Sequence, residues 1–286
     1  MATVRLQAGG LSMRMGVVWG VAAAILSGGA QQAQDTAEPS ASATPPTAER
    51  PNGDYYADAL VCPDDVPVNA RRGRMTIPSN NRTVDAMVYA PRGTPNGAVI
   101  VMLHGPRGLR ATLPVFDPRA LQLASRGYFV VMPQYYDATS GEMERERRNL
   151  DRWRDVADDV ATRMAEVPGV DAKRVGVWGV SLGGWLAAEG AMRNPSLRSA
   201  VAVSAGAAMA PARSFRRPAS ILMVNAAGDP VISAESATEF AADLRQRGAE
   251  LDARTLEGDA HFLAQPQWCE TFTASREFFD RTLLAP

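Results

Sequence analysis

A serine, an aspartate and a histidine occur in this sequence in an order suited to nucleophilic catalysis. Ser181 is the central residue of Gly-Val-Ser-Leu-Gly at positions 179–183, directly after an apolar run that ends at Trp178. A Gly-x-Ser-x-Gly pattern between a strand and a helix predicts a tight turn that presents the serine hydroxyl as a nucleophile. The alternative interpretation is an ordinary turn with a serine near the N-cap of a helix.

The general base must be one of only two histidines in the chain. On a nucleophile turn of this kind the chain order is serine, then an acid, then histidine. His261 follows Ser181 and His104 precedes it, so His261 is the predicted base. His104 comes straight after an apolar run, and we expect it to brace the loop there.

The acid that orients the histidine should follow a strand between Ser181 and His261. Asp229 meets this condition, 48 residues after Ser181 and 32 residues before His261. A buried carboxylate here would fix the imidazole tautomer and stabilise the imidazolium that forms during attack. Asp259, two residues before His261, is the rival candidate.

An oxyanion formed at the serine needs two backbone N–H donors. The residue after the nucleophile, Leu182, is the first expected donor, because it also opens a helix. The second should come from the loop that follows His104. Pro106 has no N–H, so Gly105 is expected there and Arg107 is the alternative.

Three further residues are candidates for the substrate pocket. Tyr135 follows a strand end and Trp185 lies on the helix after Ser181, so both could line an acyl or aromatic site. Such aromatic residues are also common in cores, and loop arginines such as Arg107 are usually solvated rather than bound to an anionic substrate. Two histidines and two cysteines are too few for the usual structural zinc sites. The predicted serine chemistry implies neither a metal nor an organic cofactor.

Short apolar runs that alternate with amphipathic segments must position these residues. The pattern predicts an α/β fold with a mostly parallel sheet, helices on both faces and no large lid domain. The first two strands form a hairpin around Asn80-Asn81 and suit an antiparallel edge. The expected strands are 74–78, 83–89, 98–103, 128–132, 174–178, 200–203, 221–224 and 251–256, and the expected helices are 117–126, 145–166, 182–193, 235–247 and 268–283.

The N-terminal part predicts export. Residues 1–30 combine early arginines, an 11-residue apolar run and small residues in the way a signal peptide does. An uncleaved anchor helix is the alternative, although 11 residues are short for a membrane span. Residues 31–58 are rich in Ala, Ser, Thr and Pro and predict a disordered linker. Residues 59–286 are left as the catalytic domain, which we expect to be periplasmic or secreted.

Cysteine use and charge add two expectations. Cys62 and Cys269 lie near the two ends of the catalytic domain, and in an exported protein they are candidates for a disulfide. The net charge is −1, from 30 basic and 31 acidic residues, and gives no reason to expect nucleic acid or an anionic membrane as partner. A small-molecule ester is the expected partner, with no integral membrane segment after signal cleavage.

Several segments carry a family resemblance. Residues 103–105 (Leu-His-Gly), 179–184, 228–230 (Gly-Asp-Pro) and 260–262 (Ala-His-Phe) resemble the α/β-hydrolase superfamily, and most of all its dienelactone hydrolase branch. The resemblance covers roughly residues 72–284 and implies the α/β-hydrolase fold. Dienelactone hydrolase itself has a cysteine nucleophile, whereas this chain has a serine there, which favours a general esterase.

These observations together predict a serine hydrolase that cleaves a carboxylic ester through an acyl-enzyme intermediate. A serine peptidase or an acyltransferase on the same three residues is one alternative. A non-catalytic exported binding protein that kept the fold is another, because fold alone does not determine function.

Overall fold

The computed structural model describes residues 60–139, 146–210 and 214–285. The predicted signal peptide, residues 1–30, and the predicted linker, residues 31–58, lie outside these ranges. The described residues all belong to one compact unit, Glu49–Pro286. No helix within them is long and apolar enough to cross a membrane.

Eight strands in the described ranges form one mixed sheet in the order β1-β2-β4-β3-β5-β6-β7-β8. Only β2 runs against its neighbours, and the pairs from β4 to β8 are parallel, as the apolar runs predict. The hairpin lies at one edge of the sheet, as expected, and the more polar β8 lies at the other. The strands are β1 (Ala70–Ser79), β2 (Arg82–Pro91), β3 (Val99–Leu103), β4 (Phe129–Pro133), β5 (Val175–Val180), β6 (Leu197–Val203), β7 (Ser220–Ala226) and β8 (Glu250–Leu256).

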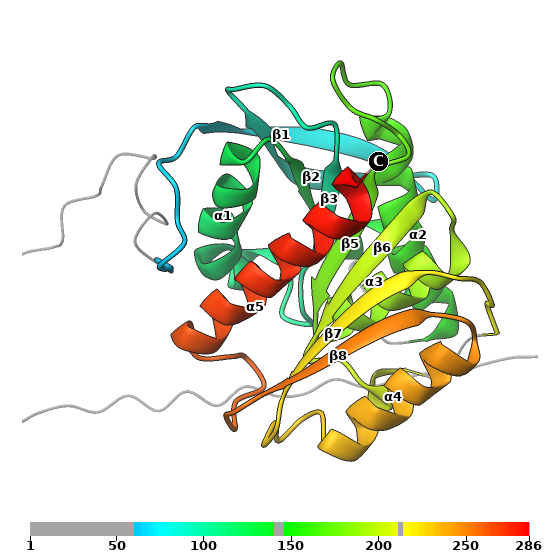
Figure 1. The fold of residues 1–286 in the computed structure, drawn as a ribbon. Coiled ribbons are helices and arrows are strands. Elements are labelled where there is room, and N and C mark those ends of the chain that lie inside the picture. Colours follow the sequence, from blue (N-terminus) through cyan, green and yellow to red (C-terminus); the bar gives the residue numbers. More distant parts are fainter. Residues whose placement is uncertain (1–59, 140–145, 211–213, 286) are drawn as a thin grey trace, which may run out of the picture. The chain divides into compact units, whose positions relative to one another are not determined.

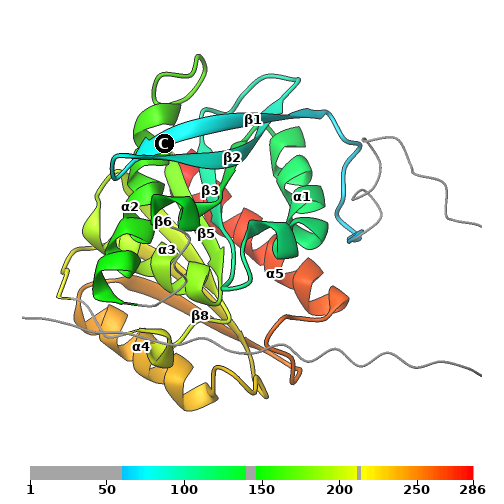
Figure 2. The ribbon, with the colours of Figure 1, turned by 180° about the vertical axis from the view of Figure 1, so that it is seen from behind.

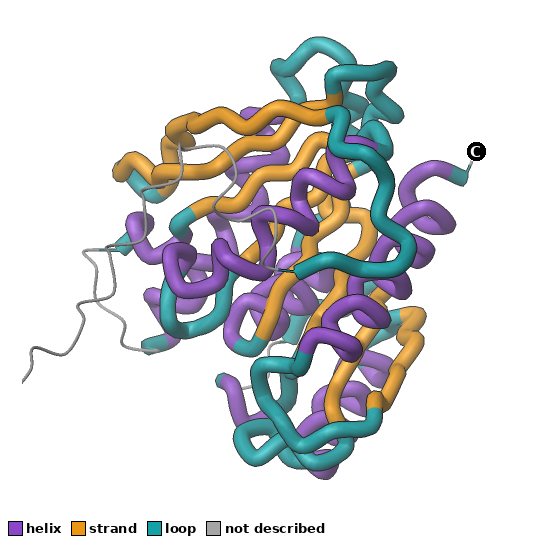
Figure 3. The backbone as a smooth tube through the Cα atoms, turned by 90° about the vertical axis from the view of Figure 1, so that its left-hand side faces the viewer, coloured by secondary structure: helices purple, strands orange, loops and turns teal. Residues whose placement is uncertain are grey.

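Helices cover both faces of the sheet, as expected (Figures 1 and 3). One core cluster joins the sheet to α2, α3 and α4, which lie in front in Figure 2, and a second joins its other face to α1 and α5. The helices are α1 (Leu109–Ser125), α2 (Arg147–Met164), α3 (Leu182–Arg193), α4 (Ala234–Gln246) and α5 (Gln265–Phe279), with short turns η1 (Tyr135–Ala138), η2 (Ala207–Met209) and η3 (Asp280–Leu284).

Helix α1 is the element whose start the sequence predicted least well. We expected residues 117–126, whereas the helix begins at Leu109. Pro114 and Pro118 lie inside it. Proline removes a helical hydrogen bond and usually indicates a break, so its presence hid the first two turns. This early start places the N-terminus of α1 directly after the His104 loop.

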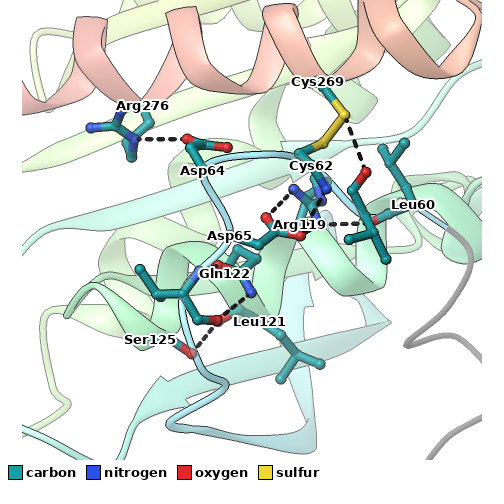
Figure 4. Close-up of polar contacts among 12 residues, drawn as sticks. Leu60, Cys62, Asp64, Asp65, Arg119, Leu121, Gln122, Ser125, Cys269 and Arg276 are labelled. Carbon is teal, nitrogen blue, oxygen red and sulfur yellow. Dashed lines mark hydrogen bonds and ion pairs between the residues drawn. A yellow bond between two sulfur atoms is a disulfide. The ribbon is translucent and has the colours of Figure 1, made fainter.

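The segment at residues 60–69 fastens α1 to α5 (Figure 4). The expected disulfide between Cys62 and Cys269 is present and joins this segment to α5, with a Cα–Cα distance of 5.3 Å. Arg119 of α1 forms hydrogen bonds of 2.6 and 2.7 Å to the two carboxylate oxygens of Asp65. Arg119 is 4% exposed, so this ion pair is well shielded from water.

The disulfide should contribute strongly to stability, because it joins residues 207 positions apart and restricts the unfolded chain. We expect Cys62→Ala combined with Cys269→Ala to lower the free energy of unfolding by about 2–5 kcal/mol. Urea unfolding followed by circular dichroism measures this change, and wild type unfolded under a reductant is the matched control. An unchanged midpoint in the double variant would show that the bridge does not support the fold.

Candidate active site

Ser181 lies between β5 and α3 in a strained backbone conformation. Its φ is 55° and its ψ is −120°, a region that residues with a side chain rarely adopt. Its N–H donates to the carbonyl of Val203 on the neighbouring strand β6, at 2.8 Å. The sequence pattern therefore folds as the predicted strand–turn–helix, with the serine at its apex.

Two glycines make this turn possible. A Cβ at Gly179 would lie 2.1 Å from the carbonyl oxygen of Gly183. A Cβ at Gly183 would lie 2.4 Å from the carbonyl oxygen of Leu103 and 2.5 Å from that of His104. Each of these contacts is with backbone, which cannot move away easily. Glycine at position 183 thus lets α3 approach the loop after β3 closely.

The three predicted catalytic side chains come together in one hydrogen-bonded chain. Nε2 of His261 is 2.9 Å from Oγ of Ser181. Nδ1 of His261 is 2.8 Å from Oδ2 of Asp229 and 3.1 Å from Oδ1. The Asp229 side chain is fully buried, whereas 22% of the His261 side chain is exposed. A substrate can therefore reach the histidine from solvent while the carboxylate stays shielded.

Asp229 is itself held by the backbone that follows it. Its Oδ1 accepts hydrogen bonds from the N–H groups of Val231 and Ile232, at 2.8 and 2.9 Å. These donors stabilise the carboxylate and fix its direction, so that Nδ1 of His261 carries the proton and Nε2 faces the serine. The rival Asp259 is exposed and forms no contact with His261 among those described.

The predicted oxyanion donors lie on either side of Ser181. Leu182 is the first residue of α3. A Cβ built on Gly105 would lie 3.8 Å from Cβ of Ser181, so this glycine is next to the nucleophile. No described residue accepts a hydrogen bond from the Gly105 N–H. The Leu182 N–H belongs to the first turn of α3, where backbone N–H groups have no partner within the helix, so both groups are available to an oxygen at the serine.

Two of the three pocket candidates do not line a pocket. Tyr135 is 0% exposed and Trp185 is 1% exposed, and both pack in the core cluster that contains α2 and α3. Their burial favours the alternative interpretation given above, that these aromatic rings belong to the core. Arg107 is exposed at the loop after His104, where its role remains a prediction.

Three apolar residues not predicted from the sequence lie beside catalytic candidates, one in space and two along the chain. Sδ of Met209 lies 3.8 Å from Oγ of Ser181. Val231 and Phe262 are 54% and 46% exposed and directly follow the Asp229-Pro230 turn and His261. Their positions beside two catalytic candidates were the only signal in the sequence. Among the described residues, no group of three or more His, Cys, Asp or Glu side chains could hold a metal ion.

The sequence model of the dienelactone hydrolase family matches residues 84–277, a range that includes Ser181, Asp229 and His261. The chain belongs to the dienelactone hydrolase family. The match covers more than half of the chain and confirms the resemblance described above. A comparison with curated proteins finds no match.

Solved structures share the fold of this family member at low sequence identity. A candidate dienelactone hydrolase of Klebsiella pneumoniae is 18% identical, with a TM-score of 0.62, and the alignment covers 74% of this chain and 99% of that one. A dienelactone hydrolase-like promiscuous phosphotriesterase from metagenomic libraries is 16% identical, with a TM-score of 0.62 and coverages of 75% and 99%.

A peptidase domain also has this fold. The acylaminoacyl peptidase of Pyrococcus horikoshii is 15% identical, with a TM-score of 0.63, and the alignment covers 76% of this chain. It covers only 43% of that peptidase, so this chain spans less than half of its length. Hydrolase folds of this kind therefore occur both alone and within longer chains.

The close approach at Gly183 generates a prediction. We expect Gly183→Ala to lower the melting temperature and to separate the His104 loop from the serine turn, because its Cβ would meet two backbone oxygens. Gly190→Ala in the same helix is the matched control, since its nearest neighbour is the flexible Leu197 side chain at 3.3 Å. Thermal melts measure both variants. Equal melting temperatures would contradict the close packing.

Proposed function

We propose that this protein is a serine hydrolase that cleaves a carboxylic ester through an acyl-enzyme intermediate. The hydrogen-bonded chain from Asp229 through His261 to Ser181 supports this most directly. A binding protein has no need of a buried carboxylate, a histidine and a strained serine in this arrangement. Membership of the dienelactone hydrolase family gives independent support for a hydrolase.

Acylation begins when Oγ of Ser181 attacks the ester carbonyl carbon and its proton passes to Nε2 of His261. The carbonyl π electrons move to oxygen, which forms a tetrahedral oxyanion. Collapse breaks the bond to the alcohol oxygen, and His261 returns the proton to the departing alcohol. Water then repeats the sequence on the acyl-enzyme, with His261 again as base and then as acid, and releases the carboxylic acid.

The surrounding groups lower the barrier of both steps. Asp229 stabilises the imidazolium and keeps Nε2 directed at the serine. The N–H groups of Leu182 and Gly105 donate to the oxyanion, and the positive end of the α3 dipole acts in the same direction. These donors are fixed before the reaction, so little reorganisation is needed when charge develops.

The side chains around the serine favour an ester with apolar substituents. The polarisable sulfur of Met209 lies next to Oγ of Ser181, and the exposed side chains of Val231 and Phe262 belong to residues that follow the Asp229-Pro230 turn and His261. Arg107 lies at the same loop as the Gly105 donor and could meet a negative charge on one part of the substrate. We therefore propose an uncharged or singly anionic small ester rather than a cationic one.

Substitution of the nucleophile tests the proposal. We expect Ser181→Ala to reduce p-nitrophenyl acetate hydrolysis by a factor of about 10⁴ or more without lowering the melting temperature. Ser204→Ala is the matched control, because Ser204 is also a buried serine at a strand end with a positive φ of 49°. It should keep wild-type activity. Full activity in Ser181→Ala would exclude Ser181 as the nucleophile.

The bond that is cleaved needs a second measurement. Wild type should hydrolyse the p-nitrophenyl ester much faster than the corresponding p-nitroanilide, because the alcohol is the better leaving group and no recognition of a peptide chain is proposed. Faster cleavage of the anilide would favour a peptidase. Transfer of the acyl group to an added alcohol in preference to water would favour an acyltransferase.

We also propose that the enzyme is exported. The signal-like pattern at residues 1–30 supports this, and a disulfide is typical of oxidising compartments. Cell fractionation with N-terminal sequencing tests it. Enzyme found in the cytoplasm with an uncut N-terminus would contradict export.

A further inference from the structure

Three successive carbonyl groups in the loop between β3 and α1, those of His104, Gly105 and Pro106, are held by hydrogen bonds. The hydroxyl of Tyr135 donates to the carbonyl of His104 at 2.9 Å, and that of Tyr136 donates to the carbonyl of Pro106 at 3.0 Å. The carbonyl of Gly105 lies 2.8 Å from Nδ1 of His104 and accepts from the N–H of Gly108 at 3.1 Å. The three peptides that carry these carbonyl groups are therefore fixed in orientation.

A fixed carbonyl also fixes an N–H group, because the two belong to one planar peptide. In a trans peptide the C=O and the N–H of the next residue point in opposite directions. The Tyr135 hydroxyl thus determines where the Gly105 N–H points, and the Tyr136 hydroxyl determines where the Arg107 N–H points. The peptide between Gly105 and Pro106 has no N–H.

The Tyr135 side chain is held firmly in place. A side chain that fixes the direction of a peptide must itself be fixed. Tyr135 is 0% exposed, and its ring stacks on the His104 imidazole with centroids 3.9 Å apart and planes at 11°. Burial lowers the pKa of His104 to about 4, so this imidazole is neutral at ordinary pH. A neutral ring can donate from Nδ1 to Gly105 while it packs against Tyr135.

Of the two possible donors, Gly105 is the one beside the nucleophile. A Cβ on Gly105 would lie 3.6 Å from the Val180 carbonyl oxygen and 3.8 Å from Cβ of Ser181. We propose that Tyr135 is a positioning residue for the oxyanion hole, and that its hydroxyl holds the His104–Gly105 peptide so that the Gly105 N–H faces the oxyanion. The inference rests on the proposed acyl transfer at Ser181.

Tyr135→Phe removes the hydroxyl and keeps the ring that packs on His104. We expect kcat for a p-nitrophenyl ester to fall about ten- to hundredfold, since loss of a complete oxyanion donor costs about 10²–10³. KM should change less than about threefold, because the donor acts mainly on the transition state. Active-site titration should normalise kcat to folded enzyme, which keeps the test valid if part of the sample misfolds.

Two tyrosines provide matched controls. Tyr128→Phe removes a hydroxyl that donates to Asp280 at 2.6 Å. Tyr128 directly precedes β4, at the opposite end of the parallel strands from the loop after β3, so this variant should leave kcat unchanged whatever it does to the melting temperature. Tyr136→Phe releases the peptide that carries the Arg107 N–H, so it should lower kcat much less than Tyr135→Phe does.

A transition-state mimic gives a readout that a merely structural role would not change. An alkyl trifluoromethyl ketone adds to a catalytic serine and forms an anionic hemiketal, so its inhibition constant should rise in Tyr135→Phe by about the same factor as kcat/KM falls. Unchanged kcat and inhibition in Tyr135→Phe, or a larger loss in Tyr136→Phe, would overturn the proposal. Inactive wild type would instead contradict the proposed function.

Discussion

The strained backbone at Ser181 is the constraint on which the site depends. A serine with φ of 55° and ψ of −120° persists only because packing on both sides leaves no alternative. On one side its N–H is bonded to Val203 of β6, and on the other Gly183 brings α3 against the carbonyl groups of Leu103 and His104. The same packing brings Gly105 next to the serine, so one tight turn positions Ser181 together with the two N–H groups proposed as oxyanion donors.

Helices α1 and α5 hold the loops of His104 and His261, which lie next to this turn. Helix α1 begins at Leu109, directly after the His104 loop, and α5 begins at Gln265, four residues after His261. The segment at residues 60–69 binds both helices, through the Asp65–Arg119 ion pair and the Cys62–Cys269 disulfide (Figure 4). The segment at residues 60–69 thus connects the helix that follows the His104 loop to the helix that follows His261.

Local patterns predicted the strand–turn–helix at Ser181 and most of the sheet, because a buried parallel strand and a Gly-x-Ser-x-Gly turn are encoded by neighbouring residues. The disulfide could only be a candidate, since a sequence does not give the Cα separation. The sequence left open whether Tyr135 and Trp185 line a pocket or belong to the core. Both are buried, which the sequence could not show because burial depends on what the other elements cover. The role proposed for Tyr135 rests on the contact of its hydroxyl with the His104 carbonyl, which a sequence does not show.

Covalent labelling of the folded protein tests the central claim, the activated serine, most directly. A fluorophosphonate reacts with a serine only where a base accepts its proton and donors stabilise the developing charge, and fluoride leaves as the Ser–P bond forms. Intact mass followed by peptide mapping should show one adduct per chain, located on Ser181, and no adduct after thermal unfolding. An unmodified folded protein, or an adduct on another residue, would contradict the account.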